Sequence, residues 1–274
     1  MEFFVGRILP YIAAGVFLAG TCLRVIGWLR TPVPFHLTLF PVPVKIFGKI
    51  WAFASEFFIF RTLYRHDRVL WLLTLLFHVT LALTLAGHLF GIYFLREQFA
   101  LFGLGPGASR QMSRILGGTA GIVMICSLGG LLYRRIAMPE VKRLSEPENF
   151  LALLLILAVA LSGIFMYLPG YHIDLPTVRT YLGSLLSATP LSPPRNAPFV
   201  IHFVLVNILL LYFPFSRMMH SIGFFVIRTM LLETPPVYPT PANTRQRSVF
   251  AAKKVSPENP ASSQTTFNRE VEPR

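Results

Sequence analysis

The sequence predicts an all-α integral membrane protein, a bundle of five transmembrane helices with one further amphipathic helix lying in the membrane interface. Its residues are 54% hydrophobic and only 14% charged, whereas an average soluble domain is about 25% charged. Five apolar stretches are close to the roughly 20 residues with which a helix crosses a bilayer. Basic residues collect in alternate connecting segments, which places the N-terminus outside and the C-terminus in the cytoplasm.

We therefore attribute the formal net charge of +13 to the basic segments that orient a membrane protein, and not to nucleic-acid binding. Only two cysteines occur, Cys22 and Cys126, and both lie in apolar stretches. They can form neither a disulfide framework nor a four-thiolate cluster, and the chain has no CxxCH motif for covalent haem attachment. Any iron–sulfur chemistry is thus expected on a partner, and any haem is expected to be held non-covalently.

The first elements follow from hydrophobic length and periodicity. The first span covers about 8–29, and we expect it to stay as a helix because no signal-cleavage pattern is recognisable. Residues 31–44 contain four prolines and are expected to be irregular. Within the range 45–60, apolar residues recur at three- and four-residue steps, and two lysines and a glutamate lie on the opposite side. This pattern is typical of a helix that lies in the membrane interface.

Four more spans complete the predicted bundle. They cover about 70–95, 115–133, 149–168, and Pro198 through His220, extending at most to Ile227. The third span follows the glycine-rich loop LFGLGPGASRQMSR and is itself rich in glycine, which permits close helix approach. A polar, proline-bearing loop separates the fourth span from the fifth.

The orientation rests on the arginines and lysines of the connecting segments. Those assigned to the cytoplasm are Arg30, Lys45, Lys49, Arg61, Arg65, Arg68, Arg134, Arg135, Lys142 and Arg143. The opposite side carries fewer, namely Arg7, Arg96, Arg110, Arg114, Arg179 and Arg195. The short loop between the third and fourth spans is the strongest evidence for this orientation, because the positive-inside rule applies best to short loops.

Two of the predicted spans carry a pair of histidines each. His78 and His88 lie in the second span, and His202 and His220 lie in the fifth. A histidine inside the membrane is costly and needs a partner or a function. Because the two spans run in opposite directions, His78 is expected opposite His220 on the cytoplasmic side, and His88 opposite His202 on the outer side. Imidazole is a common axial ligand of haem iron, so two bis-histidine haems are predicted.

The helical geometry supports this hypothesis only in part. Eighteen residues make about five full turns, so His202 and His220 share one helix face, whereas His78 and His88 lie about 80° apart. The rise between them is about 15 Å on the second span and about 27 Å on the fifth. A kink at Pro214 is expected to absorb part of this difference.

Two other classes of protein fit intramembrane histidines. One is a haem-free membrane anchor, in which the histidines only pack, and the other is a transporter with a proton relay. The absence of an inverted repeat disfavours the transporter. The remaining histidines, His36, His66 and His172, lie in loops or in a charge cluster and are expected to be solvated.

Four stretches of the sequence resemble the gamma subunit of respiratory nitrate reductase, a di-haem b membrane cytochrome. They are PYIAAGVFLAGTCLR, LFHVTLALTLAGHLFG, GGTAGIVMICSLGGLLYRR and FPFSRMMH. The resemblance covers most of 9–228 and includes one histidine pair ten residues apart and one eighteen apart. It implies that His78 and His220 hold the cytoplasmic haem b and that His88 and His202 hold the outer one.

The resemblance also implies a function. It is electron transfer between menaquinone and a cytoplasmic iron–sulfur subunit, in the cytoplasmic (inner) membrane of a prokaryote and in contact with its lipids. From their positions, Arg110 or Arg114 is a candidate to bind a quinone oxygen or a haem propionate, with simple anchoring at the interface as the alternative. On the inner side Arg217 is a candidate to neutralise a propionate or to meet an acidic partner, and an ordinary positive-inside role is the favoured alternative. Where the family has a lysine near its quinol site, this chain has Ser109. No nucleic acid is expected as a partner.

The choice of complex depends on the departures from that family. The long segment before the second span, with FFIFRTLYRHDRVLWL, is more similar to the cytochrome b subunits of Dsr sulfur-metabolism complexes and of membrane heterodisulfide reductases. We therefore favour a heterodisulfide-reductase-like partner, with a nitrate reductase beta-like partner of a molybdoenzyme as the alternative. Residues 1–232 are expected to form the di-haem membrane domain, and 233–274 a disordered or partner-binding cytoplasmic tail.

Overall fold

A computed structural model describes residues 2–31, 46–94 and 97–233, and these residues form helices and turns with no strand. The first half contains the π-helix η1 (Phe4–Ile8), α1 (Leu9–Arg30), α2 (Ile46–Ile59), α3 (Arg61–His66), α4 (Arg68–His88), the π-helix η2 (Leu89–Phe94) and the 3₁₀ helix η3 (Gln98–Phe102). The second half contains α5 (Pro106–Ala137), α6 (Pro139–Arg143), α7 (Pro147–Phe165), α8 (Leu175–Leu186), α9 (Ala197–Tyr212), the 3₁₀ helices η4 (Phe213–Phe215) and η5 (Arg217–Met219), and α10 (His220–Glu233).

Five of the helical segments in the described ranges are long and apolar enough to cross a membrane. They are Phe4–Arg30, Arg68–Ile92, Pro106–Ala137, Pro147–Phe165 and Ala197–Phe215. The prediction of an all-helical, five-span protein is therefore confirmed. The expected irregular segment and the expected tail lie almost entirely in 32–45 and 234–274, outside the described residues.

The chain divides into two compact units. The larger one comprises Met1–Pro32 and Phe53–Val226 and contains all five spans. The smaller one comprises Val33–Ala52 and Ile227–Arg274. Its described part consists of the first half of α2 and the second half of α10.

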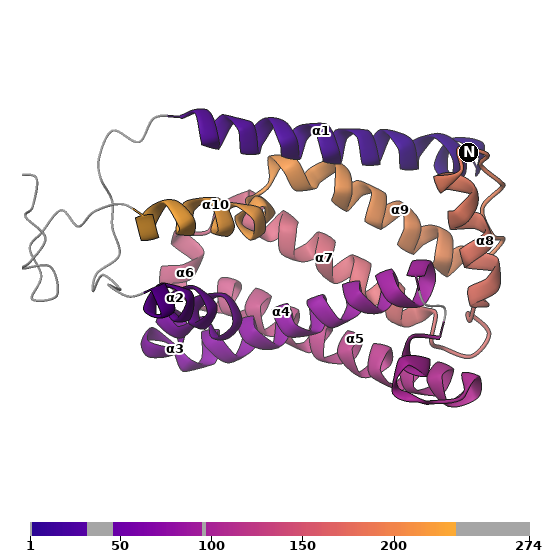
Figure 1. Ribbon diagram of the computed structural model, residues 1–274, viewed down its shortest axis with the longest axis horizontal. Helices are drawn as coiled ribbons and strands as arrows, with labels where there is room; N and C mark the ends of the chain where they lie inside the picture. The colour runs from indigo at the N-terminus through magenta and orange to yellow at the C-terminus, as the bar shows by residue number, and fades with distance from the viewer. Residues whose placement is uncertain (1, 32–45, 95–96, 234–274) are drawn as a thin grey trace, which may run out of the picture. The chain divides into compact units, whose positions relative to one another are not determined.

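Within the larger unit the spans pack in a spatial order that differs from their order in the chain. Helix α1 packs on α9, α9 on α7, α7 on α5, and α5 on α4 (Figure 1). A cluster of Phe77, Met124, Leu128 and Ala160 joins α4, α5 and α7. The approach is close at Gly130 of α5, where a Cβ atom would lie 2.8 Å from a methyl carbon of Leu73. In the described part of the chain, the two histidine-bearing spans α4 and α9 share no such packed face.

Two boundaries differ from those predicted. Helix α5 begins at Pro106, so most of the expected glycine-rich loop, including Arg110 and Arg114, is helical. The reason is local, because Gly105 is extended and a proline is favoured in the first turn of a helix. The loop expected between the fourth and fifth spans contains a whole helix, α8. It begins with Asp174 as its N-cap, whose side chain accepts a hydrogen bond from the backbone N–H of Thr177 at 2.9 Å.

The fifth span is broken, which corrects the prediction of one helix through His220. Helix α9 ends at Tyr212, two short 3₁₀ turns follow, and α10 starts at His220. Pro214 cannot continue the hydrogen-bond ladder, and Ser216 is extended and caps the next turn through its side chain. The argument that His202 and His220 share one helix face therefore does not apply, and neither does the rise of about 27 Å expected for an unbroken helix.

Candidate functional site: two histidine pairs

The fold brings His78, His88, His202 and His220 together in twos, although His220 lies beyond the fifth candidate span, which ends at Phe215. The first pair joins His78 of α4 to His220 at the start of α10, with ring centroids 6.1 Å apart and ring planes at 79°. The second pair joins His88, the last residue of α4, to His202 of α9, with centroids 6.3 Å apart and planes at 21°. The same partners were predicted from the opposite directions of the second and fifth spans.

All four imidazoles are fixed through the same ring nitrogen. The Nδ1 atom of His78 lies 2.8 Å from the Thr74 carbonyl oxygen, and that of His88 lies 2.7 Å from the Thr84 carbonyl oxygen. The Nδ1 atom of His220 lies 2.8 Å from the Arg217 carbonyl oxygen. The Nδ1 atom of His202 lies 3.1 Å from the Val159 carbonyl oxygen.

This pattern determines which ring nitrogen is available. A carbonyl oxygen only accepts hydrogen bonds, so each Nδ1 carries the proton and each neutral ring keeps its lone pair on Nε2. Metal-binding histidines almost always donate their other ring N–H in this way. Each imidazole is thus held in the tautomer that can bind a metal through Nε2.

The surroundings of the first pair are aromatic. The rings of Phe77 and Phe60 lie 4.8 and 5.1 Å from the His78 ring, centroid to centroid. Phe60 sits between α2 and α3 in the left-handed region, with φ at 51°. Such a conformation is uncommon for a bulky residue and often marks a functional position.

The second pair is contacted or supported by residues of α7 and α8, two helices that carry none of the four paired histidines. Ser162 of α7 places its Oγ 3.0 Å from His202 Nδ1. His88 is followed directly by the π-helix η2, a rare local structure that is frequent at functional sites. Arg179 of α8 donates a hydrogen bond of 2.7 Å to the Gly91 carbonyl oxygen inside η2. The helix that the sequence did not predict therefore anchors the segment next to His88.

The four rings differ in burial. His78 and His202 are half-buried, whereas His88 and His220 are exposed. In a membrane, an imidazole without a further partner is costly. Among the described residues, no group of three or more histidine, cysteine, aspartate or glutamate side chains could hold a metal ion. For a haem iron, two imidazoles are a complete protein contribution, because the porphyrin supplies the remaining ligands.

The distances fit this arrangement. With a metal–nitrogen bond of about 2.0 Å and about 1.1 Å from that nitrogen to the ring centre, two imidazoles on opposite sides of one metal have centroids about 6.2 Å apart. The two pairs lie at 6.1 and 6.3 Å. The residues present therefore fit two bis-histidine haems.

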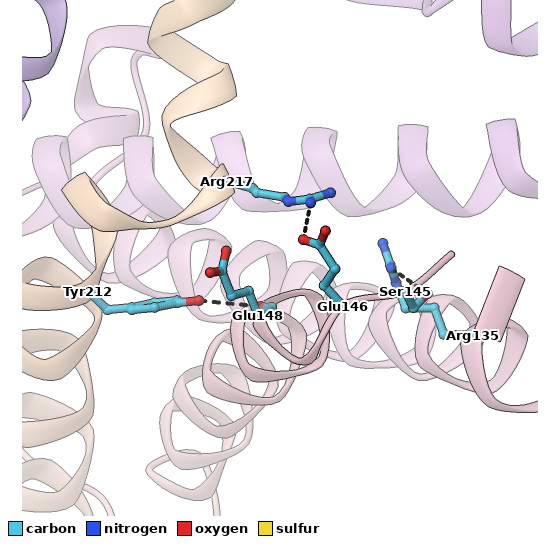
Figure 2. Close-up of polar contacts among 6 residues, drawn as sticks. All are labelled: Arg135, Ser145, Glu146, Glu148, Tyr212 and Arg217. Atoms are coloured by element: carbon cyan, nitrogen blue, oxygen red, sulfur yellow. Dashed lines mark hydrogen bonds and ion pairs between the residues drawn. The ribbon is translucent and has the colours of Figure 1, made fainter. Parts of the chain in front are cut away.

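The three arginines expected at the site lie in different settings. Arg217 forms an ion pair with Glu146, beside hydrogen bonds from Arg135 to Ser145 and from Tyr212 to the Glu148 backbone (Figure 2). Its carbonyl oxygen holds His220, so Arg217 contributes to the first pair through its backbone while its guanidinium faces a carboxylate.

Arg110 and Arg114 are exposed on the first turns of α5. Arg114 lies near Tyr167, where burial raises the pKa of the phenol and the guanidinium partly offsets that rise. Ser109, next to Arg110, is fully buried, and its Oγ accepts a hydrogen bond of 3.1 Å from the Phe99 backbone N–H. Of the other histidines, His66 and His172 are exposed, and His36 lies outside the described residues.

Sequence reasoning missed Phe60, Val159 and Ser162. Ser162 stands in the sequence Leu-Ser-Gly within an apolar span, and a lone intramembrane serine followed by glycine is the only signal that could have drawn attention to it. The value of φ at Phe60 has no sequence signature.

The fold and site define a multi-pass membrane protein with two facing imidazole pairs, and comparison with known proteins identifies its family. The chain belongs to the nitrate reductase gamma subunit family, whose model matches residues 37–238. A protein of Archaeoglobus fulgidus named Hdr-like menaquinol oxidoreductase cytochrome b-like subunit is 30% identical, over 80% of this chain and 76% of its own length. The respiratory nitrate reductase 2 gamma chain of Escherichia coli is 26% identical, over 78% of this chain and 86% of its own.

Proposed function

We propose that this chain is the membrane cytochrome b subunit of a quinone oxidoreductase complex, in which His78 and His220 would hold one haem b and His88 and His202 a second. The observation that carries the proposal is the geometry of the two pairs, with ring centroids 6.1 and 6.3 Å apart. Membership of the nitrate reductase gamma subunit family supports it, as does a relative named as a menaquinol oxidoreductase subunit.

The residues of the chain have two tasks in this function, and the haems have a third. The carbonyl oxygens of Thr74, Thr84, Val159 and Arg217 orient the imidazoles and raise their basicity. The haems, when bound, supply one-electron carriers at two depths of the membrane. The apolar helices exclude water from the space around the rings, and burial is one of the factors by which a protein sets a haem potential.

The proposed orientation places the first pair near the cytoplasm and the second pair near the outer face. It follows from the basic residues of the loop between α5 and α7, and α2 then lies in the cytoplasmic interface. Labelling with a membrane-impermeant maleimide tests it in a chain whose two cysteines are replaced by serine. Ser187→Cys should react in intact spheroplasts and Glu140→Cys only after lysis, and the reverse pattern would contradict the orientation.

A quinone is proposed to react near the second pair. Menaquinol is oxidised there, its protons leave to the outside and its electrons pass toward the first pair, and the reverse direction uses the same residues. Arg110 and Arg114 have the hydrogen-bonding capacity to hold a quinone oxygen or a haem propionate, and their position at the start of α5 keeps them at the same end as Tyr167.

The partner is proposed to be a cytoplasmic iron–sulfur subunit. The long segment before α4 favours a heterodisulfide-reductase-like partner in a prokaryotic cytoplasmic membrane, and the relative from Archaeoglobus fulgidus is named as part of an Hdr-like oxidoreductase. In this proposal 1–232 form the haem-binding domain and 233–274 a cytoplasmic tail. Proteins that co-purify in mild detergent test the partner, since a molybdenum-containing catalytic subunit would indicate the nitrate reductase type instead.

The spectrum of the purified chain tests the haems. A reduced-minus-oxidised spectrum should show low-spin b-type bands, and pyridine haemochromogen analysis should give two haems per chain. A haem-free anchor would show neither, because imidazole rings at centroid distances of about 4.5–7 Å can also simply pack on each other. A proton-relay transporter would likewise be colourless, so an absence of haem would overturn the proposal.

A further inference from the structure

We infer that Ser162 of α7 is a positioning residue for the second histidine pair, and that it sets the potential of the haem at that site through His202. The inference rests on the proposed function, since it concerns the haem that His88 and His202 would hold. Nothing in the names of the relatives assigns a role to α7, which carries no histidine.

The second pair differs from the first in how one ring is held. His78 and His88 each bond to a carbonyl oxygen four residues earlier in their own helix, and His220 bonds to one three residues earlier. His202 alone among these four bonds to another span, where both the Val159 carbonyl oxygen and the Ser162 hydroxyl lie within 3.1 Å of its Nδ1.

The hydrogens of this cluster can be assigned. The Ser162 hydroxyl donates a bond of 2.9 Å to the Val159 carbonyl oxygen, which leaves its own lone pairs free to accept from His202 Nδ1–H. Nδ1–H is therefore shared between two acceptors. Ser162 is only 8% exposed, so water does not replace the hydroxyl when it is removed.

Gly163, the next residue, sets how close α7 comes to the ring. A Cβ atom at this position would lie 3.3 Å from His202 Cε1 and 3.5 Å from Nδ1. The pair Ser162 and Gly163 thus provides an acceptor and a space for the same imidazole.

The expected consequence is electronic. Acceptors on Nδ1–H raise the basicity of the metal-binding nitrogen, and a more basic axial ligand favours the oxidised iron. Removing the Ser162 hydroxyl should therefore raise the midpoint potential of the haem at the second pair. The haem at the first pair should keep its potential, because the rings of His78 and His220 bond to the carbonyl oxygens of Thr74 and Arg217 and not to Ser162.

The test is a redox titration of the detergent-purified full chain, followed by absorption and by low-temperature EPR, in three variants. Ser162→Ala should shift one of the two midpoints upward, and Ser162→Thr, which keeps the hydroxyl, should restore the wild-type value. Ser127→Ala is the matched control, because Ser127 is a buried serine of α5 whose hydroxyl donates a 2.9 Å bond to the Met124 carbonyl oxygen of its own helix and not to a histidine.

The outcomes separate this inference from the proposed function. Wild-type protein without haem would overturn both. Two haems with unchanged midpoints in Ser162→Ala, or equal shifts in Ser127→Ala, would overturn only the role of Ser162. If Ser162→Ala does not assemble, Gly163→Ala decides: its added methyl group presses on the His202 ring and should alter the low-spin EPR signal of one haem only, and an unaltered signal would overturn the inference.

Discussion

Single hydrogen bonds decide what the histidines of this chain can do. The opposite directions of the second and fifth spans pair His78 with His220 and His88 with His202, but they do not determine how the rings are oriented. The carbonyl oxygens bonded to each Nδ1 supply that information, because they fix the tautomer of all four rings. These acceptors could not be predicted from sequence, since every helical residue has a carbonyl group and only the side-chain rotamer selects one.

Phe60, next to the first pair, provides a test of backbone strain that does not depend on haem. Its φ of 51° strains any residue with a Cβ atom, and its ring packs on His78. Phe60→Gly and Phe60→Ala both lose the ring, but only the glycine variant relieves the backbone. We expect Phe60→Gly to be more stable than Phe60→Ala by about 1 kcal/mol in thermal unfolding in detergent.

A neighbouring residue supplies the control for this comparison. Phe58 lies within helix α2 and is 67% exposed. Glycine is less favourable than alanine inside a helix by about 1 kcal/mol, so the order of the two variants should reverse there. The same order at both positions would contradict the strain at Phe60.

At the scale of elements, the sequence was sufficient for the five spans and insufficient for the details that build the site. Long apolar stretches are a strong signal because a bilayer requires a helix of known length. Helix α8, of 12 residues, escaped prediction because it is short and its loop is polar and rich in proline. The break after Tyr212 was expected only as a kink at Pro214, since the extended conformation of Ser216 depends on tertiary packing.

The start of α4 gives a prediction about acid stability. The Asp67 carboxylate accepts a 2.8 Å hydrogen bond from the Leu70 backbone N–H and pairs with Arg134 of α5. The Leu70 bond and then Arg134 hold the pKa of Asp67 below its ordinary value, against an opposing effect of burial. Its contribution is therefore complete above the unfolded pKa of about 3.9 and is lost as the pH falls through the lower folded value.

Two substitutions separate the cap from the ion pair. Asp67→Ala removes both and should lower the free energy of unfolding by about 0.5–2 kcal/mol at pH 7, the usual effect of losing an N-cap. Asp67→Asn keeps an acceptor for Leu70 and should lose less. Thermal unfolding should show that the stability of both variants declines less steeply below pH 4 than that of the wild type. Declines of equal slope in the variants and the wild type would contradict the role assigned to Asp67.

At the scale of the whole molecule, the site is carried by α4, α9 and α10, and α4 and α9 share no extensive packed face among the described residues. Helix α9 packs on α7, α7 on α5 and α5 on α4 (Figure 1), and this series of contacts positions α4 relative to α9, where His88 faces His202, while His78 of α4 faces His220 at the start of α10. A bundle that only anchored a partner would gain more from direct contact between α4 and α9, because dispersion and close packing drive helix association in a membrane. Separated spans with facing imidazoles are what an inserted planar cofactor requires.

The most direct test of this account replaces each histidine in turn and counts the haems in the purified chain. His78→Ala and His220→Ala should each lose the same haem, and His88→Ala and His202→Ala should each lose the other, as judged by pyridine haemochromogen content and by which midpoint disappears from a redox titration. Loss of different haems from the two members of a pair, or retention of both haems in all four variants, would contradict the central claim.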